Sequence, residues 1–164
     1  MNYTIKILTL NDVINFRTIR LLALKIAPKM FGSNYEIEIG KPLSFFQDCI
    51  NNSIVFGVYN EEQMIALATL TKEGVAKMSH KAYLSSVFVI PEFQNLGVAN
   101  ELLRTVINYA KQHIEQILLT VASDNFKAVK LYKKFNFEVY GIEFKALKDG
   151  DEYIDEQLMK LFLN

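Results

Sequence analysis

Residues 87–103 form the segment whose residue types suggest chemistry most directly, and they read VFVIPEFQNLGVANELL. Val87–Ile90 is an apolar run typical of a strand, Pro91 ends it, and a helical pattern begins directly after Gly97–Ala99. The first amides of a helix have no partner within the helix and lie at the positive end of its dipole. Small residues at such a turn let a ligand approach the backbone. The segment therefore predicts a site for an anion such as a pyrophosphate, bound without a lysine.

This turn is neither of the common nucleotide-binding motifs. It lacks the Gly-Lys-Ser/Thr of a P-loop and the three glycines of the dinucleotide fingerprint. On its own, Gln94–Ala99 is equally compatible with a plain strand-to-helix turn. Val87–Val89 is likewise compatible with an ordinary buried strand.

A second segment, Asn125–Phe137, reads NFKAVKLYKKFNF and has helical periodicity. Asn125 is a residue type favoured at helix N-caps. Ala128, Leu131 and Tyr132 recur on one side of the predicted helix, which favours a core aromatic at position 132. These residues alone do not distinguish a structural from a functional tyrosine.

Together the two segments resemble the GNAT acetyltransferase superfamily. The acyl-CoA loop of that family, Gln/Arg-x-x-Gly-x-Gly/Ala, is matched by Gln94–Ala99, with Ala99 in the place of the second glycine. The pattern Asn-x-x-Ala-x-x-Leu-Tyr-x-x-x-Gly-Phe is matched by Asn125–Phe137, with Asn136 where the family usually has Gly. Asparagine tolerates positive φ better than other non-glycine residues, so the turn that ends this helix is expected to survive. The spacing of the two segments and the order of elements over nearly the whole chain also agree.

The resemblance implies that acetyl-CoA is the co-substrate. In the family, the backbone of residues matching Val87 and Val89 pairs with the amides of pantetheine, on a strand splayed from its neighbour, here Ile117–Val121. Asn125 would hydrogen-bond the same arm in addition to capping its helix. The resemblance gives these cofactor-binding residues: Val87, Phe88, Val89, Gln94, Asn95, Leu96, Gly97, Val98, Ala99, Asn100, Asn125 and Tyr132.

The implied reaction is direct attack of a neutral primary amine on the acetyl carbonyl, without a covalent intermediate. The family tyrosine that matches Tyr132 lies beside the thioester sulfur and can protonate the departing thiolate as general acid. A phenol with an ordinary pKa of about 10 stays protonated at neutral pH and is a competent donor. The amide of Val89 could help to polarise the carbonyl.

The general base is less well defined by the sequence. Many family members carry a glutamate near the strand before the loop, but residues 79–86 read SHKAYLSS and contain no carboxylate. His80 titrates in a suitable range, although an exposed loop histidine is an equally good interpretation. Glu36 and Glu38 lie where related folds shape the acceptor site and could bind a cationic amine or relay its proton; the alternative is a solvated loop. Cys49 lies on a predicted apolar helix and is expected to be a core residue and not a nucleophile.

Three functions are compatible with these residues. The first is an acetyl-CoA-dependent N-acetyltransferase that acts on the primary amine of a small molecule or peptide. The second is a protein N-terminal or lysine acetyltransferase. The third is a non-catalytic acetyl-CoA-binding sensor or interaction module, which the missing base favours and Tyr132 disfavours. The stretches KMFGSNYEIE and DGDEYIDEQLM resemble a broad bacterial branch of the family without a uniform substrate.

Composition limits the remaining classes. The chain has 164 residues, 51% of them hydrophobic, which suits one domain over residues 1–164 with a full core. Lys plus Arg and Asp plus Glu number 18 each, so we expect no nucleic-acid partner. The single cysteine, the absence of a signal-like N-terminus and the absence of a long apolar run predict a cytoplasmic protein with no membrane partner. Two isolated histidines and one cysteine predict no metal site. A homodimer formed through the last strands is possible.

The periodicity places these residues on a mixed sheet. It predicts the order β-α-α-β-β-β-α-β-α-β-β and an α/β (α+β) fold, in which a mixed sheet has helices on both faces. The resemblance to the GNAT family implies that this sheet is mostly antiparallel with one parallel, splayed strand pair. The expected strands are Tyr3–Ile7, Ile54–Tyr59, Met64–Leu70, Ala82–Ile90, Ile117–Val121, Phe137–Leu147 and Tyr153–Leu163. The expected helices are Val13–Leu24, Leu43–Ile50, Leu102–Ala110 and Asn125–Phe135, with residues 28–42 as a loop or broken helix.

Overall fold

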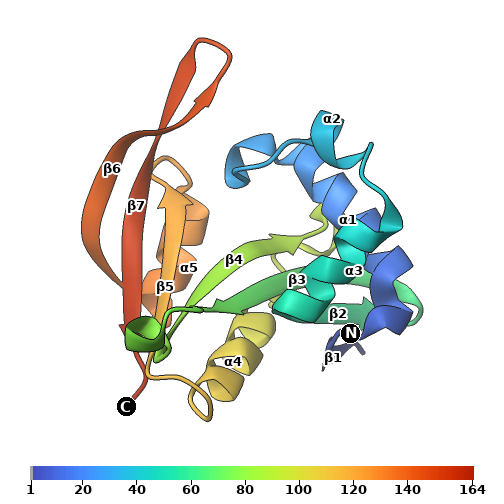
Figure 1. Ribbon diagram of the computed structural model, residues 1–164, viewed down its shortest axis with the longest axis horizontal. Coiled ribbons are helices and arrows are strands. Elements are labelled where there is room, and N and C mark those ends of the chain that lie inside the picture. Colours follow the sequence, from blue (N-terminus) through green and yellow to red (C-terminus); the bar gives the residue numbers. More distant parts are fainter. Residues whose placement is uncertain (1) are drawn as a thin grey trace. The chain divides into compact units, whose positions relative to one another are not determined.

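The computed structural model describes residues 2–164 (Figure 1). Its strands are β1 (Thr4–Ile7), β2 (Ile54–Asn60), β3 (Gln63–Lys72), β4 (Lys81–Val89), β5 (Gln116–Ala122), β6 (Glu138–Asp149) and β7 (Glu152–Phe162). Its α-helices are α1 (Val13–Ile26), α2 (Tyr35–Glu38), α3 (Leu43–Asn52), α4 (Val98–Ala110) and α5 (Phe126–Lys134). The predicted order of elements is confirmed apart from one additional short helix, α2, which lies within the residues 28–42 expected to form a loop or a broken helix.

The strands form a seven-stranded mixed sheet in the order β1-β2-β3-β4-β5-β7-β6. β4 and β5 pair in parallel, through Lys81–Tyr83 and Gln116–Leu118 at the start of both strands. The pairs β1/β2, β2/β3, β5/β7 and β6/β7 are antiparallel. The predicted mixed sheet with one parallel pair is therefore confirmed.

The chain divides into two compact units. The first comprises Met1–Thr71 and Leu84–Tyr109, and the second Lys72–Tyr83 and Ala110–Asn164. β4 contributes residues to both, since Lys81–Tyr83 belong to the second unit and Leu84–Val89 to the first. The single domain expected over residues 1–164 stays a prediction, and each unit is described by itself below.

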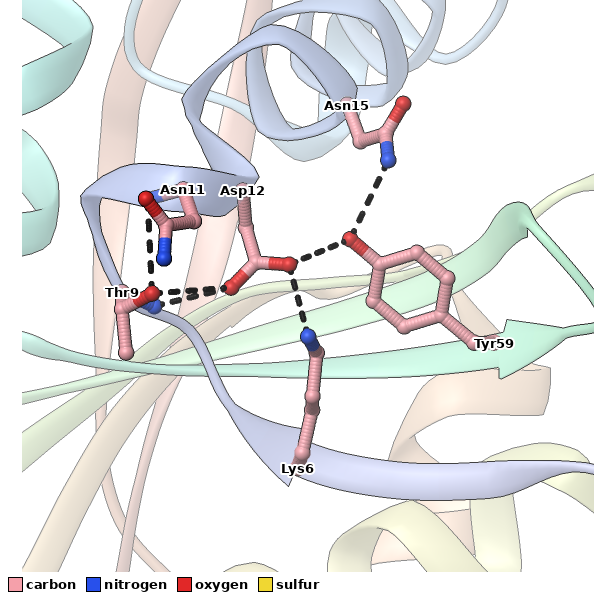
Figure 2. Close-up of polar contacts among 6 residues, drawn as sticks. All are labelled: Lys6, Thr9, Asn11, Asp12, Asn15 and Tyr59. Atoms are coloured by element: carbon pink, nitrogen blue, oxygen red, sulfur yellow. Dashed lines mark hydrogen bonds and ion pairs between the residues drawn. The ribbon is translucent and has the colours of Figure 1, made fainter.

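In the first unit, a buried carboxylate fixes the start of α1 (Figure 2). The Asp12 side chain accepts from the amide of Thr9 at 2.9 Å, and the two residues form a capping box around a short 3₁₀ turn. The same carboxylate accepts from the Tyr59 hydroxyl of β2 at 2.8 Å and from Lys6 Nζ of β1 at 2.8 Å. These bonds tie the first helix to the first two strands, and the apolar face of α1 contributes Phe16, Ile19 and Leu24 to the core.

In the second unit, β6 and β7 form a long hairpin whose turn is tighter than expected (red in Figure 1). The sequence predicted strands ending at Leu147 and starting at Tyr153. The strands instead extend to Asp149 and from Glu152, which leaves only Gly150 and Asp151 between them. Gly150 adopts φ 59°, the left-handed conformation that such two-residue turns require.

Candidate functional site

The last residues of β4 present two backbone amides to one edge of the strand. The amide of Ile90 donates to the carbonyl of Ile65 in β3 at 2.9 Å. Because the amides of successive residues in an extended strand point to opposite edges, those of Val87 and Val89 point away from β3. Phe88 between them is buried. The arrangement offers donors for a ligand that adds to this edge like a strand.

The turn after β4 is held by a side chain and by two left-handed residues. Gln94 Nε2 donates to the carbonyl of Val89 at 3.0 Å, which folds the turn back onto the end of the strand. Asn95 and Gly97 adopt φ 61° and 85°. A Cβ built on Gly97 would meet no atom within 4 Å, so glycine is required there by its backbone conformation and not by crowding. The space beside Gly97 is open to a ligand.

α4 begins at this turn, and its first amides precede the first hydrogen bond of the helix. Its first helical hydrogen bond runs from the amide of Glu101 to the carbonyl of Gly97 at 3.1 Å. The amides of Val98 and Ala99 precede that bond, at the positive end of the helix dipole. The Val98 side chain is buried and fixes the helix, while Leu96 is exposed. The first unit thus brings together the loop residues expected from the sequence, in a geometry suited to an anion.

In the second unit, Asn125 is the N-cap of α5. Its side chain accepts from the amide of Ala128 at 3.2 Å, as the cap interpretation predicted. The bond uses the carbonyl oxygen and leaves the side-chain amide group as a donor. A contact of Asn125 with pantetheine stays a prediction.

Tyr132 lies on the buried face of α5. Its side chain is 8% exposed and packs edge-to-face against Phe137, with ring centroids 5.7 Å apart. Burial raises the pKa of the Tyr132 phenol above its ordinary value, so the hydroxyl is protonated at neutral pH. The residue is therefore a buried aromatic whose phenol carries its proton, and its role as general acid stays a prediction.

The helix that carries Tyr132 ends as the sequence predicted. Asn136 adopts φ 69°, and the amide of Phe137 donates to the carbonyl of Tyr132 at 3.1 Å. Asparagine thus fills the left-handed position at which the family usually has glycine.

His80 lies directly before β4, at the end of the strand opposite to Val87–Val89. It is exposed, and its carbonyl accepts from the amides of Glu115 and Gln116 at 2.8 and 3.2 Å. This backbone role fastens the start of the β4–β5 ladder. His80 is thus an exposed residue of a turn, and its role as the general base stays a prediction.

Glu36 and Glu38 differ sharply although both belong to α2. Glu36 is exposed, whereas the Glu38 side chain is only 2% exposed and its two oxygens accept from Nε and Nη2 of Arg20 at 3.0 and 2.9 Å. Burial is the largest influence on the Glu38 carboxyl and raises its pKa, but hydrogen bonds from Arg20 and Ser33 outweigh it, and the pKa is lowered overall. The solvated loop considered for this segment is wrong for Glu38, because a cation 18 positions earlier in the chain pairs with it.

Sequence reasoning missed Ser86 entirely. This β4 residue adopts φ 56° and accepts a 2.6 Å hydrogen bond at Oγ from Nη1 of Arg20. Serine in a strand carries no local signal for such a conformation. The sequence did contain a signal at Arg20, because a charged residue there lies next to Ile19 on the apolar face of a helix. Charged residues in such places are usually paired.

Two further kinds of candidate group are the thiol of Cys49 and possible metal ligands. Cys49 is half-buried, and burial, the largest influence, raises the pKa of its thiol, which disfavours the nucleophilic thiolate. Over the described part of the chain, no group of three or more His, Cys, Asp or Glu side chains is arranged to hold a metal ion. Within the same residues, no helix combines the length and apolarity needed to cross a membrane.

Comparison with known proteins identifies what this chain is similar to. A family model described as an acetyltransferase (GNAT) domain matches residues 5–158. An N-alpha-acetyltransferase of Sulfolobus acidocaldarius is 28% identical over 159 residues, which cover 93% of this chain and 89% of that protein. The L-amino acid N-acetyltransferase AaaT of Escherichia coli is 40% identical over 76 residues, which cover 44% of this chain and 46% of that protein. The latter match thus spans less than half of the relative's length.

Solved structures share the fold over the whole chain. An acetyltransferase of the GNAT family from Streptococcus pneumoniae superposes with a TM-score of 0.87 at 18% identity, covering 98% of this chain and 99% of the other. The yncA structure from Salmonella typhimurium, which contains its cofactor acetyl-CoA, has a TM-score of 0.82 at 16% identity, with 100% and 95% covered. At these identities the likeness establishes the fold alone.

Proposed function

This chain belongs to the GNAT acetyltransferase family, and on that premise we propose that it transfers the acetyl group of acetyl-CoA to an α-amino group. The family match covers residues 5–158 and makes the protein an acetyl-CoA-dependent N-acetyltransferase. The proposal adds the acceptor, the route of attack and the roles of particular residues.

The observation that carries the proposal is the continuous strand–turn–helix of Val87–Ala99. It offers the amides of Val87 and Val89 along one edge and those of Val98 and Ala99 at the start of α4. Pantetheine is an extended diamide and suits the first pair, while the pyrophosphate of coenzyme A suits the second. Gly97 and Asn95 give the turn the left-handed conformations that aim these amides at a ligand.

An α-amine is the acceptor that best fits the lack of a carboxylate base in residues 79–86. The amine must be neutral to attack the thioester. The α-amine of a peptide N-terminus has an ordinary pKa of about 8, whereas that of a lysine side chain is about 10.4, so near neutral pH the N-terminal amine loses its proton far more readily. A water chain could then take the proton without a dedicated base. The names of two relatives, an L-amino acid N-acetyltransferase and an N-alpha-acetyltransferase, are consistent with this acceptor class.

Tyr132 is proposed to protonate the thiolate of coenzyme A as it leaves. The buried phenol keeps its proton over the neutral range because burial raises its pKa. In the balanced step, the amine nitrogen bonds to the acetyl carbon, the carbon–sulfur bond breaks, and the phenol proton passes to sulfur. The surplus proton on nitrogen is lost to solvent, and a proton from solvent restores the Tyr132 phenol. No covalent acyl-enzyme is involved.

The first experiment is a calorimetric titration of the protein with acetyl-CoA, with dephospho-CoA and ATP as comparison ligands. Stoichiometric binding of acetyl-CoA, with weaker binding of ATP, is expected if pantetheine and pyrophosphate are both bound. An acceptor panel follows: free L-amino acids, peptides with a free N-terminus, and N-acetylated peptides with one lysine, monitored by thiol release and mass spectrometry. Modification of the lysine peptides alone would refute the α-amine acceptor. Binding without turnover on any amine would favour the acetyl-CoA sensor.

A further inference from the structure

One guanidinium group joins three elements of the first unit. Arg20 in α1 binds both oxygens of Glu38, the last residue of α2, and its remaining Nη1 donates to Ser86 in β4 at 2.6 Å. The three residues are separated by 18 and 48 positions in the sequence. The network therefore fixes α1, α2 and the final part of β4 relative to one another.

The two charges of this network are paired, with Glu38 buried and Arg20 half-buried. The Glu38 side chain is 2% exposed and that of Arg20 is 19% exposed, and the guanidinium contacts the carboxylate directly. The guanidinium also lies over the ring of Phe31, 5.2 Å from its centroid. A planar guanidinium can donate two hydrogen bonds to a carboxylate from one edge and a third to a hydroxyl from another edge. A lysine ammonium cannot form this arrangement of hydrogen bonds. With both oxygens engaged, Glu38 is not available as a simple anionic ligand for a cationic acceptor.

Ser86 is the unusual partner. It adopts φ 56° inside a strand, a conformation that costs a non-glycine residue free energy unless the surroundings hold it. Such a residue marks a local irregularity that changes the direction of the strand after it. The residues after it are Val87, Phe88 and Val89, whose amides form the edge assigned above to pantetheine. The left-handed residue Ser86 thus lies directly before the edge assigned to the cofactor.

We propose that Arg20 and Glu38 are positioning residues that hold Ser86 in its left-handed conformation and so align the Val87 and Val89 amides for acetyl-CoA. This inference rests on the proposed function, since it assigns those amides to the cofactor. Glu38 acts by fixing the plane of Arg20, and Arg20 acts through Ser86. The ion pair contributes to affinity for acetyl-CoA although neither of its charges touches the cofactor.

The test compares Ser86→Ala, Ser86→Gly and Arg20→Lys, with Arg17→Lys as the matched control. Arg17 lies on the same helix over the ring of Phe46, outside the network. Ser86→Ala and Arg20→Lys are expected to raise the Kd for acetyl-CoA roughly fivefold to tenfold, as for the loss of one charge-assisted hydrogen bond. Ser86→Gly is expected to stay closer to the wild type than Ser86→Ala, because glycine adopts positive φ without the bond. Equal affinities for wild type, Ser86→Ala and Arg20→Lys would overturn the proposal.

A double variant separates positioning from stability. Arg20→Met/Glu38→Leu removes both charges together, which in buried pairs commonly preserves stability. If the ion pair only stabilises the fold, the double variant should regain both the thermal midpoint and the acetyl-CoA affinity that Arg20→Lys loses. If the pair positions Ser86, the double variant should regain the thermal midpoint, but its Kd for acetyl-CoA should stay raised, as in Ser86→Ala.

Hydrogen exchange of the peptide covering residues 84–90 gives a readout that needs no cofactor. Faster exchange is expected in Ser86→Ala and Arg20→Lys and not in Arg17→Lys. If the wild type fails to bind acetyl-CoA, the proposed function fails, and with it the link to the cofactor. If the wild type binds and neither exchange nor affinity changes in the variants, this inference alone fails.

Discussion

The Tyr59 hydroxyl donates a 2.8 Å hydrogen bond to Oδ1 of Asp12, so β2 and the start of α1 share one buried carboxylate (Figure 2). Lys6 Nζ lies 2.8 Å from the same oxygen. Burial is the largest influence on Asp12 and raises its pKa, but the hydrogen bonds from Lys6, Thr9 and Tyr59 outweigh it, and the pKa is lowered overall. Burial also raises the pKa of Tyr59 to about 12, so its phenol remains a donor. The cluster is therefore a stabilising contact between an ionised acid and neutral or cationic donors.

We expect Tyr59→Phe to lower the free energy of unfolding by about 1–2 kcal/mol at neutral pH, since it removes a buried hydrogen bond to a charged group. The pKa of Asp12 is lower in the folded protein than in the unfolded chain, where it is about 4, so ionised Asp12 stabilises the fold above that pH. This stabilisation is lost as the pH falls through the pKa of Asp12 in the folded protein. Urea unfolding at pH 7 and near pH 3 measures both effects, and the difference between variant and wild type should shrink at the lower pH. Tyr153→Phe, at an exposed ring, is the control. A deficit that is equal at both pH values would contradict an ionised Asp12.

Gly97→Ala tests the loop through its backbone. The residue adopts φ 85°, which costs alanine about 1–3 kcal/mol, and the added methyl group would occupy the open space beside the first amides of α4. We expect the Kd for acetyl-CoA to rise roughly tenfold or more, measured by calorimetry. Gly74→Ala is the matched control, because its Cβ also meets no atom within 4 Å and its φ is not positive. Unchanged affinity in Gly97→Ala would remove the loop from the anion site.

The fold was largely predictable because its signals are local or periodic. Strict apolar runs predicted β2, β3 and β5, and the recurrence of Leu102, Val106 and Ala110 predicted α4. Asn125 and Asn136 predicted both ends of α5, since a cap and a left-handed turn each depend on one residue type. The ends of β6 and β7 were less predictable. The polar residues around Gly150 suggested a longer turn, but Gly150 permits a two-residue turn, so both strands extend further than predicted.

The candidate site was predictable only where its residues are contiguous. The loop over Gln94–Ala99 follows from its own sequence, but the bonds from Arg20 to Glu38 and Ser86 join three distant segments. Neither hydrophobic periodicity nor turn residues specify which charged side chains will form an ion pair in the folded protein. The positive φ of Ser86 is likewise imposed by the surrounding structure and not by serine itself.

Asn136 gives a prediction about stability alone. Asn136→Gly is expected to raise the free energy of unfolding by up to about 1 kcal/mol, because glycine adopts φ 69° without strain, while Asn136→Ala should lower it by about 1 kcal/mol. Thermal and urea unfolding measure both changes, and acetyl-CoA affinity should be unaffected in either variant. A loss of stability in Asn136→Gly would show that the Asn136 side chain makes a stabilising contact that outweighs its backbone cost.

Tyr132→Phe tests the chemistry. Removal of the hydroxyl leaves the ring contact with Phe137 in place, so we expect normal folding and a normal Kd for acetyl-CoA. The loss of a general acid should lower kcat by about 10²- to 10⁴-fold, measured by thiol release with the best acceptor. Because burial raises the pKa of this phenol, its deprotonation should not limit the wild-type rate between neutral pH and about pH 9. Phe137→Leu is the control for packing, since it disturbs the ring contact and keeps the donor. A Tyr132→Phe enzyme with the wild-type kcat would assign the residue to the core alone, and water would then have to protonate the leaving thiolate.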